Sequence, residues 1–252
     1  MSSDYVVGII PARYGSTRLP AKALADICGK PMVQWVYERA KKSRLLSHII
    51  IATDDERIVK AVHQFGGEAI MTPESCTSGS DRCAAAAREI DADLIVNIQG
   101  DEPLIPPTMI DSAIQPLIDD QTIQMGTVAR PLSSTAELHD PGVVKVVIDR
   151  SGFALYFSRS AIPYVRDIAD TAAWTNRYTF YKHFGLYVYR KEFLLQFSTL
   201  PVTELEKAES LEQLRVLEHG YRIHIAVTQD DSVSVDTADD LARVVKTIEG
   251  LT

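Results

Sequence analysis

A cluster of basic and hydroxyl side chains follows the first apolar segment of the chain. Residues 11–22 read PARYGSTRLPAK and come directly after a predicted strand over residues 5–10. The functional residues of this segment are Arg13, Gly15, Ser16, Thr17, Arg18 and Lys22. Cations can neutralise a polyphosphate, and hydroxyls and the amides around a glycine can donate hydrogen bonds to it. The loop matches neither the P-loop nor the dinucleotide GxGxxG pattern, and an ordinary solvated basic loop stays open as an alternative.

Two acidic segments could together supply a magnesium site. Asp101 and Glu102 follow an apolar strand predicted over residues 94–98, and Asp101 is the expected ligand. A turn before a proline explains this segment equally well. Asp236 stands at the start of the predicted closing helix, where, taken alone, an N-cap explains it without any metal. If Asp101 and Asp236 met at one edge of the sheet, they would suit Mg²⁺, which often uses one or two carboxylates and substrate oxygens.

Polar side chains in the second half could bind a polyhydroxylated ligand. Alternation along the strand predicted over residues 184–189, extended by one residue, places on one face His183, Gly185, Tyr187 and Tyr189. Residues 203–219 predict one helix, and the face opposite its leucines carries Glu209, Glu212 and Gln213. A buried histidine with a satisfied ring and a solvated helix face are the commoner outcomes of such patterns.

The elements of the first half alternate between apolar runs and segments of helical period. The predicted strands cover residues 5–10, 48–52, 68–71 and 94–98. The predicted helices cover residues 31–43, 58–65, 80–90 and 108–119. This order predicts an α/β fold with a Rossmann-like, mostly parallel sheet and crossover helices, which places ligands at the carboxyl ends of the strands.

The second half changes to β-branched and aromatic runs with little helix between them. Strands are predicted over residues 143–148, 153–157, 184–189 and 222–227, and a closing helix over residues 236–249. We therefore expect a single domain over residues 1–252 that includes a smaller mixed or antiparallel lobe at about residues 131–200. Residues 167–178 are polar and predict an irregular connection.

The composition excludes several classes of protein. The 252 residues are 46% hydrophobic and 24% charged, with a formal net charge of -8, which is ordinary globular usage. The negative charge weighs against a nucleic-acid partner and against a membrane-surface protein. The sequence predicts no membrane span and no secretory signal, so we expect a cytoplasmic location. The cysteines, Cys28, Cys76 and Cys83, lack the spacing of a zinc site and predict reduced thiols.

Nine motifs in a fixed order resemble those of one known family. They are IIPARYGSTRLPAK, ATDDERI, SGSDR, NIQGDEPLIPP, VVKVV, ALYFSRSAIP, KHFGLYVYR, LEQLRVL and VDTADDL. The chain resembles the 3-deoxy-manno-octulosonate cytidylyltransferases, also called CMP-Kdo synthetases, over nearly its whole length. The resemblance implies a fold of the nucleotide-diphospho-sugar transferase type. It also implies a nucleotidyltransferase that joins CTP to the acid sugar Kdo (3-deoxy-manno-octulosonate), giving CMP-Kdo and pyrophosphate for lipopolysaccharide biosynthesis.

The resemblance also implies roles for individual residues. The triphosphate would be held by Arg13, Ser16, Thr17, Arg18 and Lys22, of which the two arginines and the lysine, together with Asp101, would act in catalysis. Ser78 and Arg82 would lie on the nucleotide side. Asp101 and Asp236 would bind Mg²⁺. The acid-sugar pocket would be formed by Gln99, Arg159, His183, Tyr187, Glu212 and Gln213, with Arg159 facing the sugar carboxylate. A homodimer through the smaller lobe is implied as well.

The sequence departs from the family pattern near the lysine. The usual PGKPL reads Pro20-Ala21-Lys22-Ala23-Leu24 here, and Ser80 replaces the threonine of SGTDR. These differences leave room for an amino-substituted substrate such as 8-amino-Kdo. Two other classes, a sugar-nucleotide-dependent glycosyltransferase and a non-catalytic nucleotide-binding regulator, are disfavoured. The first would show a DxD motif at the relevant strand end, and the second would not need a polar second lobe.

Overall fold

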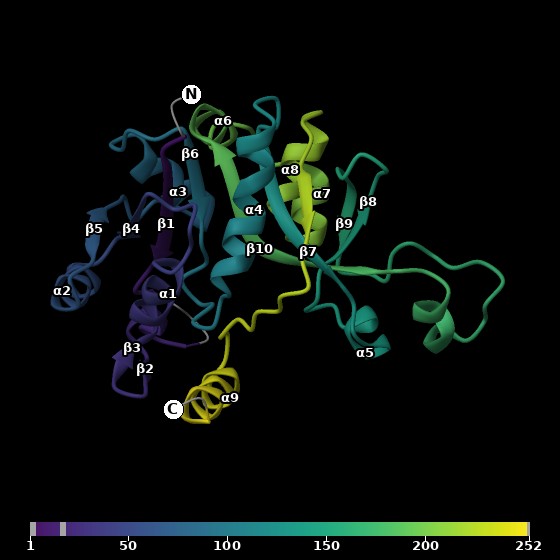
Figure 1. The fold of residues 1–252 in the computed structure, drawn as a ribbon, viewed down its shortest axis with the longest axis horizontal. Helices are drawn as coiled ribbons and strands as arrows, with labels where there is room; N and C mark the ends of the chain where they lie inside the picture. Colours follow the sequence, from purple (N-terminus) through teal and green to yellow (C-terminus); the bar gives the residue numbers. More distant parts are fainter. Residues whose placement is uncertain (1–3, 16–18, 251–252) are drawn as a thin grey trace.

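One mixed sheet of nine strands runs through the described part of the chain, residues 4–15 and 19–250, in the computed structural model. The strand order is β11-β7-β10-β6-β1-β4-β5, and β8 and β9 continue from β10 (Figure 1). The strands of this sheet are β1 (Val6–Ala12), β4 (His48–Thr53), β5 (Glu68–Met71), β6 (Leu94–Asn97), β7 (Met125–Pro131), β8 (Lys145–Ile148), β9 (Ala154–Ser158), β10 (Tyr181–Arg190) and β11 (His224–Val227). A separate hairpin joins β2 (Asp26–Ile27) and β3 (Lys30–Pro31).

The parallel half of the sheet confirms the prediction from the sequence. β1 pairs in parallel with β4 and with β6, and β4 pairs in parallel with β5. Apolar side chains are buried on both faces of β1 and β6, as expected for strands covered by helices on each side. Because these strands are parallel, their carboxyl ends share one edge, and the segments that follow β1, β4 and β6 are neighbours there.

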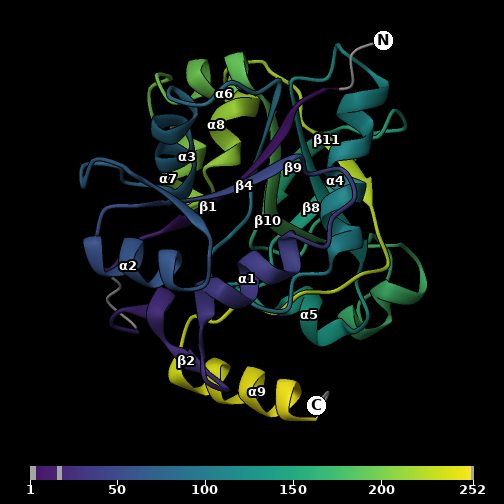
Figure 2. The ribbon, with the colours of Figure 1, turned by 60° about the vertical axis from the view of Figure 1, so that its left-hand side comes forward.

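Helices cover both faces of this sheet. The helices are α1 (Met32–Ala40), α2 (Glu56–Gln64), α3 (Gly79–Ala87), α4 (Pro107–Asp119), α5 (Thr135–His139), α6 (Lys191–Phe197), α7 (Glu204–Glu209), α8 (Gln213–Glu218) and α9 (Ala238–Glu249), with 3-10 turns at Lys22–Leu24 and Thr171–Asn176. Apolar side chains of α1, α2 and α4 form one core with the sheet. Those of α3, α6 and α8 form the other, and Figure 2 shows these three helices gathered on one side.

The second half differs from the prediction in two elements. β7, which the sequence did not predict, lies between β10 and β11 and is buried over most of its length. Its sequence, MGTVARP, contains glycine, proline and arginine and so carries little strand signal. The single helix expected over residues 203–219 is wrong, because Ser210 adopts a left-handed conformation (φ 51°) that ends α7 before α8 begins. The alternative of a solvated helix face is wrong as well, since Gln213 is only 3% exposed.

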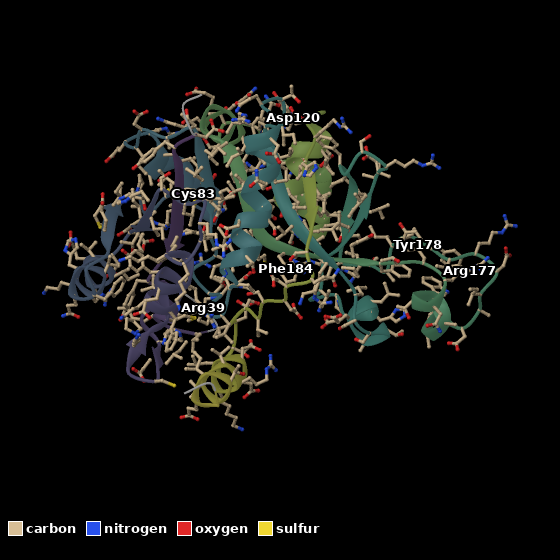
Figure 3. All side chains as sticks on the ribbon, in the orientation of Figure 1. Arg39, Cys83, Asp120, Arg177, Tyr178 and Phe184 are labelled. Atoms are coloured by element: carbon tan, nitrogen blue, oxygen red, sulfur yellow. The ribbon has the colours of Figure 1, made fainter. Side chains whose placement is uncertain are left out.

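The smaller lobe extends from β10 rather than forming a sheet of its own. β8 and β9 form an antiparallel pair, and β8 joins the start of β10. Between β9 and β10 the chain forms an arm that carries the second 3-10 turn and reaches away from the sheet (Figure 1). Figure 3 shows Arg177 and Tyr178 on this arm, far from Cys83 of α3. Trp174 and Phe180 pack with Leu138 of α5 and so anchor the arm.

The closing helix α9 lies against the β2–β3 hairpin rather than against the sheet. Val244 and Ile248 of α9 pack with Ile27 and Met32. Val235, directly before α9, is fully buried in the same cluster. The C-terminal segment is thereby held beside the segment that follows β1. Of the helices that the structure describes, none combines the length and the apolar character that crossing a membrane requires.

Candidate active site

A polar cavity of about 330 Å³ lies at the carboxyl ends of β1 and β6, beside the first turn of α3. Of the residues that the sequence assigned to a site, it is lined by Arg13, Lys22, Ser78, Arg82, Gln99, Asp101 and Asp236. These residues come from four separate segments of the chain. Ser16, Thr17 and Arg18 lie outside the described residues. The fold therefore brings the basic loop and both acidic segments to one place.

Lys22 connects the two acidic residues. Its Nζ donates to Asp101 Oδ2 at 2.6 Å and to Asp236 Oδ1 at 3.1 Å. The backbone adds a further link, since the amide of Val235 donates to the carbonyl of Asp101 at 2.8 Å. Two carboxylates that approach one ammonium group offer oxygen donors to a small cation at the same position. Asp101 and Asp236 thus have the donor chemistry that Mg²⁺ requires.

The N-cap expected at Asp236 is wrong. Thr237 caps α9, because its Oγ1 accepts from the amide of Asp240. The carboxylate of Asp240 in turn accepts from the amide of Thr237. Asp236 lies one residue earlier, where its side chain reaches Lys22. A threonine supplies the cap as well as an aspartate would, so Asp236 is available for the cavity.

The wall formed by Gln99-Gly100-Asp101 requires its glycine. A Cβ on Gly100 would lie 2.6 Å from the carbonyl oxygen of Pro11 in β1, closer than any side chain can approach. The contact brings the segment after β6 against the end of β1. Asp101 then faces the cavity, whereas Glu102 turns inward and is 7% exposed. Burial raises the pKa of Glu102 to about 7.

The first turn of α3 supplies the opposite wall. Ser78 caps the helix, because its Oγ accepts from the amide of Asp81. The carboxylate of Asp81 in turn accepts from the amide of Ser78. Arg82 follows one turn later and is 3% exposed. Its Nη2 donates to Asp54 Oδ2 at 2.8 Å and its Nη1 to Thr72 Oγ1 at 2.6 Å. Arg82 is therefore a fixed group of the wall with a carboxylate partner of its own.

A set of buried and half-buried polar side chains adjoins this wall on the side of β10. His183 contacts Thr127 Oγ1 through Nε2 at 3.0 Å, and burial lowers the pKa of His183 to about 3. Tyr187 donates its hydroxyl proton to Gln213 Oε1 at 3.1 Å. The rings of His183 and Tyr187 lie 5.5 Å apart, and those of Tyr187 and Tyr189 lie 6.1 Å apart. The shared face expected for these residues is confirmed.

Gln99 and Glu212 connect this set to the cavity. Gln99 lines the cavity, and its Nε2 donates to Asn97 Oδ1 at 3.2 Å and to the carbonyl of Gly185 in β10 at 3.0 Å. Glu212 lies near the hydroxyls of Ser78 and Ser80 at the start of α3, and burial raises the pKa of Glu212. A ligand that extended from the cavity toward β10 would therefore meet amide, hydroxyl and carboxyl groups.

Arg159 is not among the residues that line the cavity. Its Nε donates to the carbonyl of Glu209 at 2.8 Å, its Nη1 to that of Pro141 at 3.0 Å, and its Nη2 to that of Ser210 at 3.4 Å. Its own carbonyl accepts from Lys145, a fully buried lysine on β8. The structure thus places Arg159 in a network that fixes the end of α7.

Sequence reasoning gave no role to Asp54 or Lys145. Both lie within motifs that support the family resemblance, ATDDERI and VVKVV. A single lysine inside an apolar strand is a signal for a buried, fully bonded ammonium group, and Lys145 donates to the carbonyls of Asp140, Val143 and Arg159. Asp54 carried no comparable signal, because its partners are distant in sequence.

The sheet, its covering helices and the cavity at the carboxyl edge define a Rossmann-like nucleotidyltransferase. Two structures share this fold at 14–16% identity with TM-scores of 0.63 and 0.62, a 4-diphosphocytidyl-2C-methyl-D-erythritol synthase from Anaerococcus prevotii and a cytidylyltransferase from Leptospira borgpetersenii. The model of the cytidylyltransferase family matches residues 7–223. This chain belongs to that family and, within it, to the 3-deoxy-manno-octulosonate cytidylyltransferases.

Curated relatives carry that name over nearly their whole length. The protein of Geobacter metallireducens is 56% identical over 245 residues, which is 96% of either chain. That of Geotalea uraniireducens is 54% identical over 248 residues, 97% of this chain and 99% of the relative. A CMP:2-keto-3-deoxy-manno-octonic acid synthetase complexed with CTP superposes with a TM-score of 0.92 at 41% identity, over 98% of this chain and 100% of the other.

Proposed function

We propose that this protein transfers the cytidylyl group of CTP to Kdo, giving CMP-Kdo and pyrophosphate for lipopolysaccharide biosynthesis. The observation that carries the proposal is the meeting of Lys22, Asp101 and Asp236 at one cavity wall. This wall is what a metal-triphosphate complex needs, and the chain is that of a cytidylyltransferase. The acidic net charge and the anionic substrate are compatible because Arg13 and Lys22 line the cavity and a bound metal ion would offset the charges of Asp101 and Asp236.

The reaction needs alignment and charge neutralisation more than covalent help from the protein. A hydroxyl of the sugar attacks the α-phosphorus in line with the departing pyrophosphate. Lys22 and Arg13 line the cavity and would stabilise the negative charge that develops on pyrophosphate. Arg18, Ser16 and Thr17 are proposed to assist them. Ser78 and Arg82 hold the nucleoside end against α3, which fixes the α-phosphorus relative to the sugar.

We propose that Asp101 and Asp236 hold Mg²⁺. The two carboxylates already converge on one cation, the ammonium of Lys22, and therefore fit a small divalent ion in donor chemistry. When bound, Mg²⁺ would neutralise phosphate charge and orient the substrates. Lys22 would then lose part of its contact with the carboxylates and bind the phosphate oxygens. Its side chain is flexible and its ammonium group can donate to any nearby anion.

The sugar is proposed to occupy the space between the cavity and β10. Gln99 and Glu212 border both regions, and His183, Tyr187 and Gln213 form the polar surface behind them. Arg159 is proposed to face the sugar carboxylate and to donate to it from the guanidinium N–H groups that do not bind backbone carbonyls. A homodimer through the smaller lobe and a cytoplasmic location stay predictions, supported by the family resemblance and by the sequence respectively.

Product analysis tests the proposed reaction. Purified protein with Mg²⁺, CTP and Kdo should release pyrophosphate and form CMP-Kdo, and omission of Mg²⁺ with a chelator present should stop it. Parallel reactions with 8-amino-Kdo, and with UTP, ATP and GTP, define the substrates. Absence of pyrophosphate release from every nucleotide with either sugar would refute the proposal.

A further inference from the structure

Two neighbouring aspartates after β4, Asp54 and Asp55, bind different arginines. Asp55 caps α2 at the protein surface, where its carboxylate binds Arg57 at 2.6 and 2.8 Å. Asp54 instead reaches the cavity wall, where its carboxylate accepts from Arg82 and from the amide of Tyr14. The motif ATDDERI therefore contains two carboxylates, each in an ion pair with a different arginine, of which only the pair of Asp54 involves a residue of the cavity lining.

The carboxylate of Asp54 bonds to both walls of the cavity. Its Oδ2 accepts from Arg82 Nη2 at 2.8 Å, and its Oδ1 accepts from the backbone amide of Tyr14 at 3.3 Å. Arg82 lines the cavity, and Tyr14 directly follows Arg13, which lines it as well. The side chains of Arg82 and Asp54 are 4% and 15% exposed, so water screens this ion pair weakly.

A second anchor fixes the plane of the Arg82 guanidinium. Thr72 Oγ1 accepts from Nη1 at 2.6 Å and donates to the carbonyl of Thr53 at 3.0 Å. Because the guanidinium is a rigid fork, two anchored nitrogens determine the directions of its remaining N–H groups. Asp54 and Thr72 together thus set what Arg82 presents to a ligand.

The ion pair with Asp54 also determines which part of a nucleotide Arg82 can bind. Asp54 neutralises the charge of Arg82 in a pair that is almost buried, so this wall offers directed donors without a net positive charge. Arg13 lines the cavity elsewhere, and Lys22 holds its two carboxylates through partly exposed ion pairs, which a phosphate can replace. We propose that Asp54 is a positioning residue that orients Arg82 and the backbone at Tyr14 toward the uncharged, nucleoside part of CTP. This inference rests on the proposed function.

The test compares Asp54→Asn with Asp55→Asn by calorimetric binding of CTP and of inorganic pyrophosphate, and by steady-state kinetics. In Asp54→Asn we expect the Kd and the KM for CTP to rise about tenfold, as for a lost charge-assisted hydrogen bond, with kcat changed less than about threefold. Pyrophosphate should bind as tightly as before or tighter, because a carboxylate has been removed from the wall. Asp55→Asn should leave all these values within about twofold, since surface ion pairs contribute little.

Other results would overturn the inference. Tighter binding of both ligands would show that Asp54 only repels the triphosphate, and weaker binding of both would show general damage to the cavity. A double variant adds a second readout: with Arg82→Gln already present, Asp54→Asn should change CTP binding less than about twofold, and a further tenfold loss would show that Asp54 does not act through Arg82. Failure of the wild type to bind CTP would refute the proposed function itself; normal wild-type binding with an unchanged Asp54→Asn would refute only this inference.

Discussion

The cavity and the polar groups of the smaller lobe hold their charges in different ways. In the cavity Lys22, Asp101 and Asp236 have side chains that are 19%, 26% and 37% exposed, and they bind one another. The lobe and the adjoining helix α8 carry Lys145, Arg159, His183, Tyr187 and Gln213, which we call the lobe polar groups. Of these, Lys145, Gln213 and His183 are 0%, 3% and 8% exposed.

The partners of the two sets differ as well. The cavity charges are paired with each other across flexible side chains, so a metal ion or a phosphate can replace a partner at low cost. The lobe polar groups bond to backbone carbonyls or to neutral side chains that are themselves buried. Loss of one partner there leaves a buried polar group unsatisfied. Removing a cavity charge should therefore cost mainly activity, whereas removing a buried lobe polar group should cost stability, in addition to any loss of the proposed contact with the sugar.

The largest effect is expected for Asp101→Asn, which removes a charge and keeps the side-chain shape. The rate of pyrophosphate release should fall about 1000-fold, or about 4 kcal/mol, because the proposed metal site loses one of its two carboxylates. The free energy of unfolding should change by less than about 1 kcal/mol, since the ion pair is partly exposed. Asp119→Asn, at an exposed end of α4, is the matched control. Retention of more than a tenth of the activity would contradict the role of Asp101.

Lys145→Met should have the opposite profile. The substitution removes the bonds that Lys145 donates to the carbonyls of Asp140, Val143 and Arg159, of which Asp140 keeps the amide of Val143, and should lower the free energy of unfolding by about 3 kcal/mol. Urea unfolding measures this change. Lys191→Met removes one bond, to the carbonyl of Ile90, and should cost about 1 kcal/mol. If both variants lowered the free energy of unfolding equally, the burial of Lys145 and its three hydrogen bonds would add nothing to stability beyond a single bond.

His183 should make the stability of the lobe depend on pH. Burial holds the pKa of His183 at about 3, below its ordinary value of 6.5, so the unfolded chain binds a proton that the folded chain does not. Stability should be unaffected above pH 6.5 and should fall as the pH decreases from 6.5 toward 3. Relative to His183→Gln, which cannot titrate there, the wild type should lose about 2 kcal/mol between pH 6.5 and 5. Parallel stability curves for the two proteins would show that the ring is accessible to protons.

The smallest effect is expected at the start of the Lys22 segment. Ala21 adopts a left-handed conformation (φ 54°, ψ 33°) at the position where the family pattern has glycine. The backbone shape expected of glycine is thus kept by alanine, at some strain. Ala21→Gly should raise the free energy of unfolding by about 0.5–1 kcal/mol, and kcat should stay within about twofold. Ser210→Gly, at a left-handed residue beside the lobe polar groups, provides the comparison. If Ala21→Gly instead lowered the free energy of unfolding by more than about 1 kcal/mol, the inference that Ala21 is strained would be wrong.

Local patterns predicted the parallel half of the fold and its site edge well. β1, β4 and β6 have apolar sequences rich in β-branched residues, which can be recognised without their distant partners. β7 escaped prediction because its burial comes from its neighbours β10 and β11 rather than from its own composition. The break at Ser210 escaped because no glycine or proline marks it. The segment after it still buries Gln213, which then meets Tyr187.

The sequence alone determined that cations, hydroxyls and carboxylates follow apolar strands, since parallel strands end at one edge of a sheet. Only the tertiary structure decided which of them meet. Asp101 faces Lys22 whereas Glu102 is buried, and Asp236 reaches Lys22 whereas Thr237 caps the helix. These choices depend on contacts between residues that are distant in sequence: Asp101 lies 79 positions after Lys22, and Asp236 lies 214 positions after it. A side chain's direction at such a contact is fixed by the packing of β1, β6 and α9 against their neighbours, and no local pattern contains that information.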